Sequence, residues 1–275
     1  MSLTRLDGVA DAVDEARRAC EQLRWHPAMR RRSAECRVEA GVRAARCSSA
    51  LEGGRLPVEL VRDVARGARE LPADASGTLV RGALRAHAEA EHLTAAGGRP
   101  LTSAPWQALA RLHVAAAAGL VDDDALGRPR RAGERPGDVP AGTVVPEGAE
   151  LTARLEALGR LVSTPTTAPV LVLAAVVHGE LLTLRPFTGG NGVVARAVSR
   201  ALVVGRGLDP MGSAVPEAAH LSDAAGYADS LDGYASGTAA GMAAWLRHCA
   251  WAVTAGAGEG TTVADAVLAG RLPAS

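Results

Sequence analysis

The chain of 275 residues contains no lysine and no isoleucine, and only 3% of it is aromatic. Without lysine it can have neither a Schiff-base amine nor the lysine of a phosphate-binding loop. Its 30 basic and 30 acidic residues give a formal net charge of zero. Since nucleic-acid binders usually carry a basic excess, we expect no nucleic-acid partner.

Long apolar runs and paired cysteines are also missing. The longest apolar run, residues 168–177, is about half of a membrane span, and the N-terminus shows no basic segment followed by an apolar one. The cysteines form no CxxC pair, which predicts buried thiols of a reducing compartment rather than a disulfide framework. They are Cys20, Cys36, Cys47 and Cys249. We therefore expect a cytoplasmic protein with no membrane contact.

Alanine, valine and leucine are abundant and recur at helical spacing. We predict helices over about 9–24, 28–51, 57–71, 76–93, 104–118, 149–162, 167–184, 192–205, 220–232, 238–254 and 262–270, with breaks at proline or glycine that include Gly97-Gly98 and Gly256. The long irregular stretch 122–148 contains the sequence GTVV, which predicts a short β-hairpin. The expected fold class is all-α with one β-like excursion.

The stretch LRPFTGGNGVVAR, residues 184–196, holds the single Phe and the single Asn of the chain. A glycine turn directly before a helix exposes backbone N–H groups to a ligand, and such a helix start favours anions. Arg196 adds a planar, permanently charged guanidinium one and a half turns later. The pattern predicts a phosphate or nucleotide site at Gly190, Asn191, Gly192 and Arg196. The alternative is an ordinary glycine-rich turn beside a solvated arginine.

The same stretch resembles the signature of Fic (Fido-fold) proteins, His-Pro-Phe-x-Asp/Glu-Gly-Asn-Gly-Arg-x-x-Arg. A second stretch, CSSALEGG, resembles the family's inhibitory motif, with Ser48, Glu52 and Gly53 at the matching places. The resemblance covers roughly residues 35–210. It implies a Fido-type helical core with an inhibitory helix and a hairpin flap, preceded by a helical segment at 1–34 and followed by a helical extension at 211–275. A carboxylate at a helix C-terminus needs a compensating cation, and the resemblance implies that Arg196 is that cation.

Fic enzymes typically transfer AMP from ATP to a protein hydroxyl, and the resemblance identifies three positions at which this chain departs from the family. Arg185 stands where the family has the histidine that accepts the hydroxyl proton. A guanidinium is always protonated and cannot do so. Gly189 replaces the acidic residue that holds Mg²⁺, so we expect no protein-held Mg²⁺ and no other metal. Val193 replaces the first arginine of the signature.

Their spacing along a helix argues against His178 as a proton acceptor and against His87 and His92 as metal ligands. His178 lies two helical turns, about 10 Å, before Arg185, beyond hydrogen-bond reach of a reacting centre there. His87 and His92 lie about 140° apart around a helix, so they do not converge on a metal.

Three functions remain open, the third of which is a purely structural interaction protein whose pocket is vestigial. The first is a degenerate, non-catalytic or regulatory Fido protein that binds ATP or another nucleotide and acts through an unidentified protein partner. The second is an active protein adenylyltransferase, or a related transferase with altered catalytic residues, that Glu52 inhibits. Relatives of this type often dimerise, so a homodimer is also open.

Overall fold

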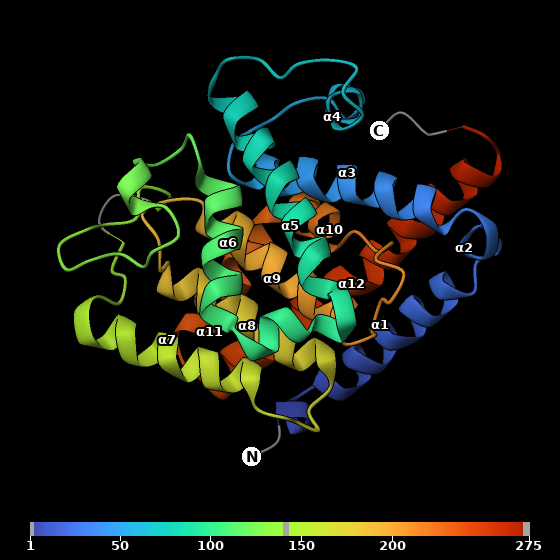
Figure 1. Ribbon diagram of the computed structural model, residues 1–275. Coiled ribbons are helices and arrows are strands. Elements are labelled where there is room, and N and C mark those ends of the chain that lie inside the picture. The colour runs from blue at the N-terminus through green and yellow to red at the C-terminus, as the bar shows by residue number, and fades with distance from the viewer. Residues whose placement is uncertain (1–2, 140–142, 272–275) are drawn as a thin grey trace.

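The computed structural model describes residues 3–139 and 143–271, and the regular secondary structure of these residues is helical, as the sequence predicts (Figure 1). The elements are η1 (Leu3–Arg5), α1 (Val9–Arg24), α2 (Pro27–Arg31), α3 (Ser33–Leu51), α4 (Val58–Ala65), α5 (Ala75–Ser103), α6 (Pro105–Ala117), η2 (Asp123–Ala125), α7 (Gly148–Ser163), α8 (Val170–Leu184), α9 (Asn191–Gly205), α10 (Pro216–Ser222), α11 (Ala224–Ala235) and α12 (Ala239–Leu268).

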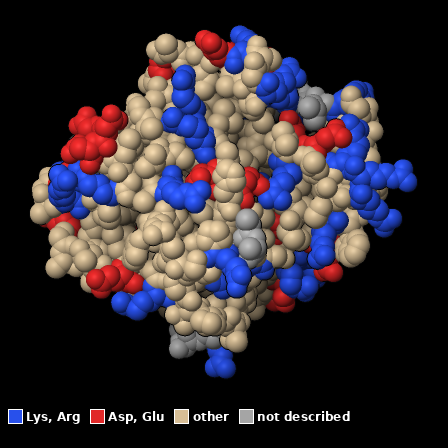
Figure 2. Space-filling model, viewed as in Figure 1, with Lys and Arg blue, Asp and Glu red and all other residues tan. Residues whose placement is uncertain are grey.

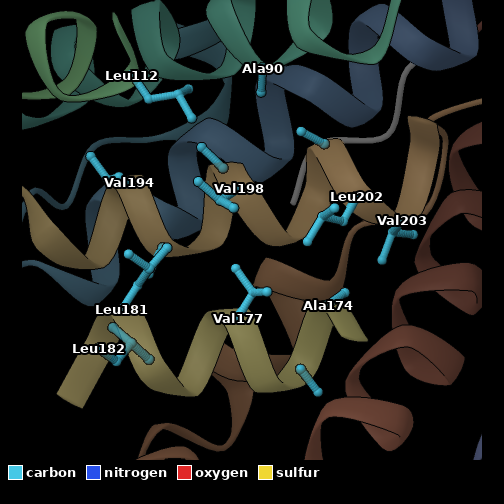
Figure 3. Packing of buried hydrophobic residues seen from close by; sticks show 14 of the residues in the cluster. Ala90, Leu112, Ala174, Val177, Leu181, Leu182, Val194, Val198, Leu202 and Val203 are labelled. Atoms are coloured by element: carbon cyan, nitrogen blue, oxygen red, sulfur yellow. The ribbon is translucent and has the colours of Figure 1, made fainter. Parts of the chain in front are cut away.

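Helix α9 lies at the centre of the fold, where α5, α6, α8 and α3 pack around it (Figure 1). Its neighbour α8 is apolar nearly all round, and most of its residues are buried, as expected for a helix inside a core. Figure 3 shows α8 and α9 side by side, with Leu181 and Val177 of α8 pointing toward α9 and Val194 of α9 pointing toward Leu112. The turn between α8 and α9 is therefore fixed at both ends by buried helices.

Several predicted helices have different bounds in the structure: the helix predicted at 57–71 ends at Ala65, the one at 76–93 continues to Ser103, and 220–232 is divided between α10 and α11. The predicted helix 28–51 is divided into α2 and α3 at Arg32, whose guanidinium leaves the helix to bind Glu35 and the carbonyl of Val267. The predicted break at Gly256 is wrong, because α12 continues to Leu268. Gly256 instead allows a close approach. Its carbonyl accepts from the N–H of Val215 at 2.9 Å, and a Cβ there would lie 2.5 Å from the nitrogen of Pro216.

The predicted break at Gly97-Gly98 is a kink inside one long helix. Helix α5 continues to Ser103, but the backbone is left-handed at Gly97 (φ 71°) and Gly98 (φ 78°). At this kink α5 touches the end of α9, where a Cβ on Gly205 would lie 2.9 Å from the Cα of Gly98. Glycine at position 205 allows the backbones to come this close, and glycine at 97 and 98 suits the left-handed backbone there.

The contact between Gly205 and Gly98 predicts an unequal effect of two alanine substitutions. Gly205→Ala should cost roughly 1–3 kcal/mol of the free energy of unfolding, because the new methyl group meets backbone that must move. Gly258→Ala, in α12, is the control. No atom lies within 4 Å of the Cβ it would add, so it should be neutral or gain up to about 1 kcal/mol of helix propensity. Urea unfolding of both variants measures this, and equal effects would contradict the close approach.

The irregular stretch 122–148 lies beside the C-terminal end of α6 and the start of α7 (Figure 1). The described part of it contains no strand, and an isolated bridge between Ala118 and Val121 lies just before it. The expected hairpin is therefore not confirmed, and Gly142 of the GTVV sequence lies outside the described residues. The stretch is ordered by side-chain contacts to the turn between α8 and α9, which are described below.

One large hydrophobic cluster contains residues from the N-terminal segment, the core and the C-terminal extension, among them Val9, Phe187 and Trp245. All four cysteines are buried and free, and burial raises the pKa of their thiols. The division at residues 34 and 210 stays a prediction, since the three parts share this cluster.

Charges of both signs are interspersed over the face shown in Figure 2. Among the described helices none combines the length and the apolar character that a bilayer crossing needs.

Candidate functional site

The site is the turn between α8 and α9, and it begins at an unusual backbone conformation. Arg185 caps the C-terminus of α8 with φ 45° and ψ 62°, and it is the one non-glycine residue with positive φ among those described. This region costs a non-glycine residue about 1 kcal/mol or more. Arg130 stabilises the turn, because its guanidinium donates to the carbonyls of Arg185 at 2.7 Å and Leu184 at 3.2 Å. A cation at a helix C-terminus is also favoured by the helix dipole.

The single Phe of the chain packs against a buried histidine of α6. The rings of Phe187 and His113 are parallel, with centroids 3.8 Å apart. The N–H of Gly127 donates to Nδ1 of His113 at 2.9 Å, so the other ring nitrogen carries the proton and donates to the carbonyl of Gly189 at 3.2 Å. Neutral His113 thus holds the glycine turn in place, a role that the sequence did not reveal.

This arrangement predicts acid lability. Burial lowers the pKa of His113 from 6.5 to about 4, so between these pH values the unfolded chain binds more protons than the folded one. The free energy of unfolding should therefore fall as the pH drops below about 6.5, by at most about 1.4 kcal/mol per pH unit for one histidine, and this loss should level off below about pH 4. Urea unfolding at pH 7, 6 and 5 should show a shallower dependence for His113→Gln. His92→Gln, at an exposed histidine, is the control. Equal slopes for all three proteins would refute the assignment.

The single Asn closes the turn on itself. The Oδ1 atom of Asn191 accepts from the backbone N–H of Phe187 at 2.9 Å, and its Nδ2 donates to the carbonyl of Phe187, also at 2.9 Å. Gly190, with φ 74°, precedes it at the N-terminus of α9. Together Gly190, Asn191, Gly192 and Arg196, which we call the cradle, surround the first turn of α9.

Arg196 is buried, with 4% of its surface exposed, so the alternative of a solvated arginine is wrong. Its guanidinium donates to Oε1 of Glu52 at 2.6 Å, to the Ser48 hydroxyl at 2.9 Å and to the Ser48 carbonyl at 3.0 Å. Burial alone would lower the pKa of Arg196, but Glu52 and Tyr227 outweigh this and raise it. The contact that the second motif implies is present, and its inhibitory role stays a prediction.

Glu52 lies against the cradle as well as against Arg196. It follows α3 directly, and Gly53 after it has a left-handed φ of 95°. A Cβ on Gly192 would lie 2.0 Å from Oε1 of Glu52. The absence of a side chain at Gly192 therefore leaves the space that this carboxylate fills.

A second carboxylate reaches the cradle from the irregular stretch, and the sequence reasoning missed it. Asp138 accepts from the backbone N–H of Asn191 at 2.8 Å, and it lies beside the guanidinium of Arg185. Nothing in the two motifs marks Asp138, because its place depends on how residues 128–138 fold onto the turn. The only sign of it in the sequence is that this acidic residue lies in the stretch where the resemblance implies a hairpin flap.

Of the remaining candidates, His178 lines a cavity together with Arg196 of the cradle, and the charge of Arg196 adds to the effect of burial on its pKa. Burial lowers the pKa of His178 to about 3, and its Nε2 lies 2.7 Å from the hydroxyl of Tyr227 in an aromatic cluster with Trp245 and His220. His87 is half-buried, whereas His92 is exposed. No group of three potential metal ligands exists among the described residues.

Two of the positions that depart from the Fic signature, Gly189 and Val193, are closely packed. A Cβ on Gly189 would meet a methyl group of Val121 at 3.0 Å. Val193 is buried in the main hydrophobic cluster. A valine at this place packs in the core, where the signature has an arginine.

Comparisons with known proteins agree with this geometry. The model of the Fic/DOC family matches residues 104–203. A Fic family protein from Desulfovibrio desulfuricans G20 has a similar structure with TM-score 0.74 and 20% sequence identity, covering 93% of this chain and 74% of that one. Fic-1 (residues 134–508) from C. elegans gives TM-score 0.68 and 17% identity, with 94% and 74% covered.

A Fic domain containing signaling protein from Bacteroides thetaiotaomicron also gives TM-score 0.68 and 17% identity, with 95% of this chain and 99% of that one covered. No curated protein gave a significant match. Residues 104–203 thus match the Fic/DOC family, and the fold of Fic proteins extends over nearly the whole chain.

Proposed function

We propose that this Fic/DOC family protein binds a nucleotide or another phosphate-bearing anion at the cradle and does not transfer AMP by the histidine-dependent route. ATP is the first ligand to test. In this proposal the protein acts as a regulatory module through a protein partner. The proposal is supported by a helix start with glycines, by the buried guanidinium of Arg196, and by the replacement of the family's proton acceptor.

The observation that carries the proposal is the hydrogen bonding of the Arg185 side chain. Its guanidinium donates to the carbonyl of Asp138 at 2.9 Å, so the side chain at the place of the family's base is a bound cation. General-base catalysis contributes about 10²–10⁴ to a rate, and a guanidinium cannot supply it. His178, the histidine nearest in sequence, and His113, which contacts the turn at Gly189, are both buried and hydrogen-bonded to other groups.

The residues at the turn do not fit a protein-held Mg²⁺. The metal prefers carboxylate oxygens, and the signature's acidic position is Gly189. The two carboxylates that do reach the turn, Glu52 and Asp138, are paired with Arg196 and Arg185. In our proposal any Mg²⁺ therefore arrives with the nucleotide phosphates.

A second candidate is an active adenylyltransferase, or a related transferase, that Glu52 inhibits. One observation favours it. The carboxylate of Glu52 binds the guanidinium of Arg196 and covers Gly192. A phosphate site that Glu52 inhibits would need these contacts. This candidate requires a proton acceptor other than residue 185.

Calorimetric titration tests the proposed function. Wild type and Glu52→Gly are titrated with ATP and with ADP, each with and without Mg²⁺. We expect binding that is tighter in Glu52→Gly, because removal of the carboxylate leaves Arg196 free for a phosphate. If neither protein released or absorbed heat at millimolar ligand, the proposed nucleotide binding would be rejected. Incubation of the same two proteins with labelled ATP and a cell lysate tests the second candidate. Labelling that appears with Glu52→Gly but not with wild type would show an active transferase that Glu52 inhibits.

A further inference from the structure

A segment of the irregular stretch lies along the turn between α8 and α9, and we call residues 128–138 the strap. The backbone N–H of Arg130 donates to the carbonyl of Pro186 at 2.7 Å, and that of Gly137 donates to the carbonyl of Thr188 at 2.8 Å. The side chain of Arg130 is buried and donates to the carbonyls of Leu184 and Arg185. One end of the strap is thus anchored at the C-terminus of α8.

The other end of the strap reaches the N-terminus of α9. The carboxylate of Asp138 accepts from the backbone N–H of Asn191 at 2.8 Å and from Nδ2 of Asn191 at 3.0 and 3.1 Å. Arg185 donates to the carbonyl of Asp138 at 2.9 Å, and its guanidinium lies 3.5 Å from the carboxylate. The side chain of Asp138 is mostly buried by these contacts.

The two ends of the strap carry opposite charges and match the two helix ends they cover. A cation lies at the C-terminus of α8 and an anion at the N-terminus of α9, which is the favourable order for both helix dipoles. The N–H group that Asp138 occupies is one that an external anion at the start of α9 would use. A carboxylate and a phosphate cannot share it, since both are negative and both need the same donor.

We propose that Asp138 is an intramolecular ligand of the cradle, and that the strap must release it before an external phosphate enters. This inference rests on the proposed function of the cradle. It also gives Arg185 a role, because the residue in place of the family's histidine holds the strap closed. Two carboxylates then close the cradle, because Glu52 binds the guanidinium of Arg196 and Asp138 binds the backbone N–H of Asn191.

The competition is tested by titration of the full chain with inorganic pyrophosphate and with ADP. The series is made in the Glu52→Gly background, so that only one of the two carboxylates remains. We expect Asp138→Asn to tighten binding of both ligands by about 10-fold or more, since a charge that repels them is gone. Asp123→Asn, which removes the same charge from an exposed position nearby, should leave the affinity within about 2-fold.

Limited proteolysis gives a readout that needs no ligand. The chain has no lysine, and trypsin cuts poorly before proline, so within the strap the bond after exposed Arg131 is the favoured site. Asp138→Asn should speed cleavage there, whereas Asp123→Asn should not. Pyrophosphate should speed it in the Glu52→Gly protein, because a ligand that displaces Asp138 also frees the strap.

The outcomes separate the two proposals. If the Glu52→Gly protein binds pyrophosphate and Asp138→Asn does not tighten it, Asp138 does not compete and only the proposed function stands. If no variant binds either ligand, the proposed function fails, and with it the competition. Cleavage after Arg131 then shows whether Asp138 holds the strap at all, and an unchanged cleavage rate would overturn that contact too.

Discussion

Replacing Arg196 by methionine is expected to destabilise the protein by about 3–5 kcal/mol, because it leaves a carboxylate without its cation in a largely dry place. Only 16% of the side chain of Glu52 is exposed, so water cannot fully replace the guanidinium. The hydroxyl and carbonyl of Ser48 lose their donors at the same time. The loss in urea unfolding should therefore be far larger than that of an ordinary surface arginine.

A double-mutant cycle measures how much of this loss belongs to the ion pair. Glu52→Gln alone should cost less, since the amide still accepts from Arg196, and the double variant should be more stable than the sum of the single effects predicts. We expect a coupling energy of about 2 kcal/mol or more, consistent with a charged, mostly buried hydrogen bond. The exposed pair Arg17–Glu21, 3.6 Å apart, is the control, and its coupling should stay below about 0.5 kcal/mol. A coupling for Arg196–Glu52 no larger than that of the control would contradict the structure.

The sequence predicted the fold class and most helix positions, because apolar residues at helical spacing report directly which faces are buried. It was least successful where one residue makes a specific long-range contact. Gly256 looks like a break in isolation, yet it is a place of close packing within α12. Arg32 looks like a helical residue, yet its backbone is non-helical (φ −131°, ψ 27°) between α2 and α3, and its side chain binds the carbonyl of Val267 far along the chain.

At the site the two motifs predicted the cradle and its partner Glu52, since those residues follow fixed spacings along helices α3 and α9. They could not predict His113, Arg130 or Asp138. Each of these acts through a backbone carbonyl or N–H group of the turn, and such contacts leave no pattern in the sequence. The long irregular stretch was expected to be a hairpin flap, whereas its described part is a strap without strands.

The second large effect that we expect is a gain of ATP-dependent self-labelling on restoring the family's residues. Arg185→His places an imidazole where the family has its base, and it removes the guanidinium that holds Asp138. Histidine tolerates the left-handed backbone at this position better than most residues do. Gly189→Asp supplies the missing carboxylate, at the cost of a small shift of Val121, whose methyl group lies 3.0 Å from the new Cβ.

The double variant Arg185→His/Gly189→Asp is best made in the Glu52→Gly background, so that Arg196 is free for the phosphates. Relative to Arg185→Ala/Gly189→Asp in the same background, we expect labelling from radioactive ATP to rise by about 10²–10⁴, the range that a general base contributes. The alanine variant is the matched control, because it also releases Asp138 but offers no proton acceptor. Equal labelling of the two folded proteins would show that the pocket no longer positions a nucleotide for transfer.

The third position of the signature should not be restored along with the other two. Val193 is 4% exposed and belongs to the main hydrophobic cluster. An arginine there would bring a charge into apolar packing without a partner, which costs several kcal/mol. We therefore expect Val193→Arg to lower the urea midpoint of the double variant sharply rather than to raise its activity. A triple variant as stable as the double one, with higher labelling, would mean that the side chain at 193 can turn out of the core toward the phosphates.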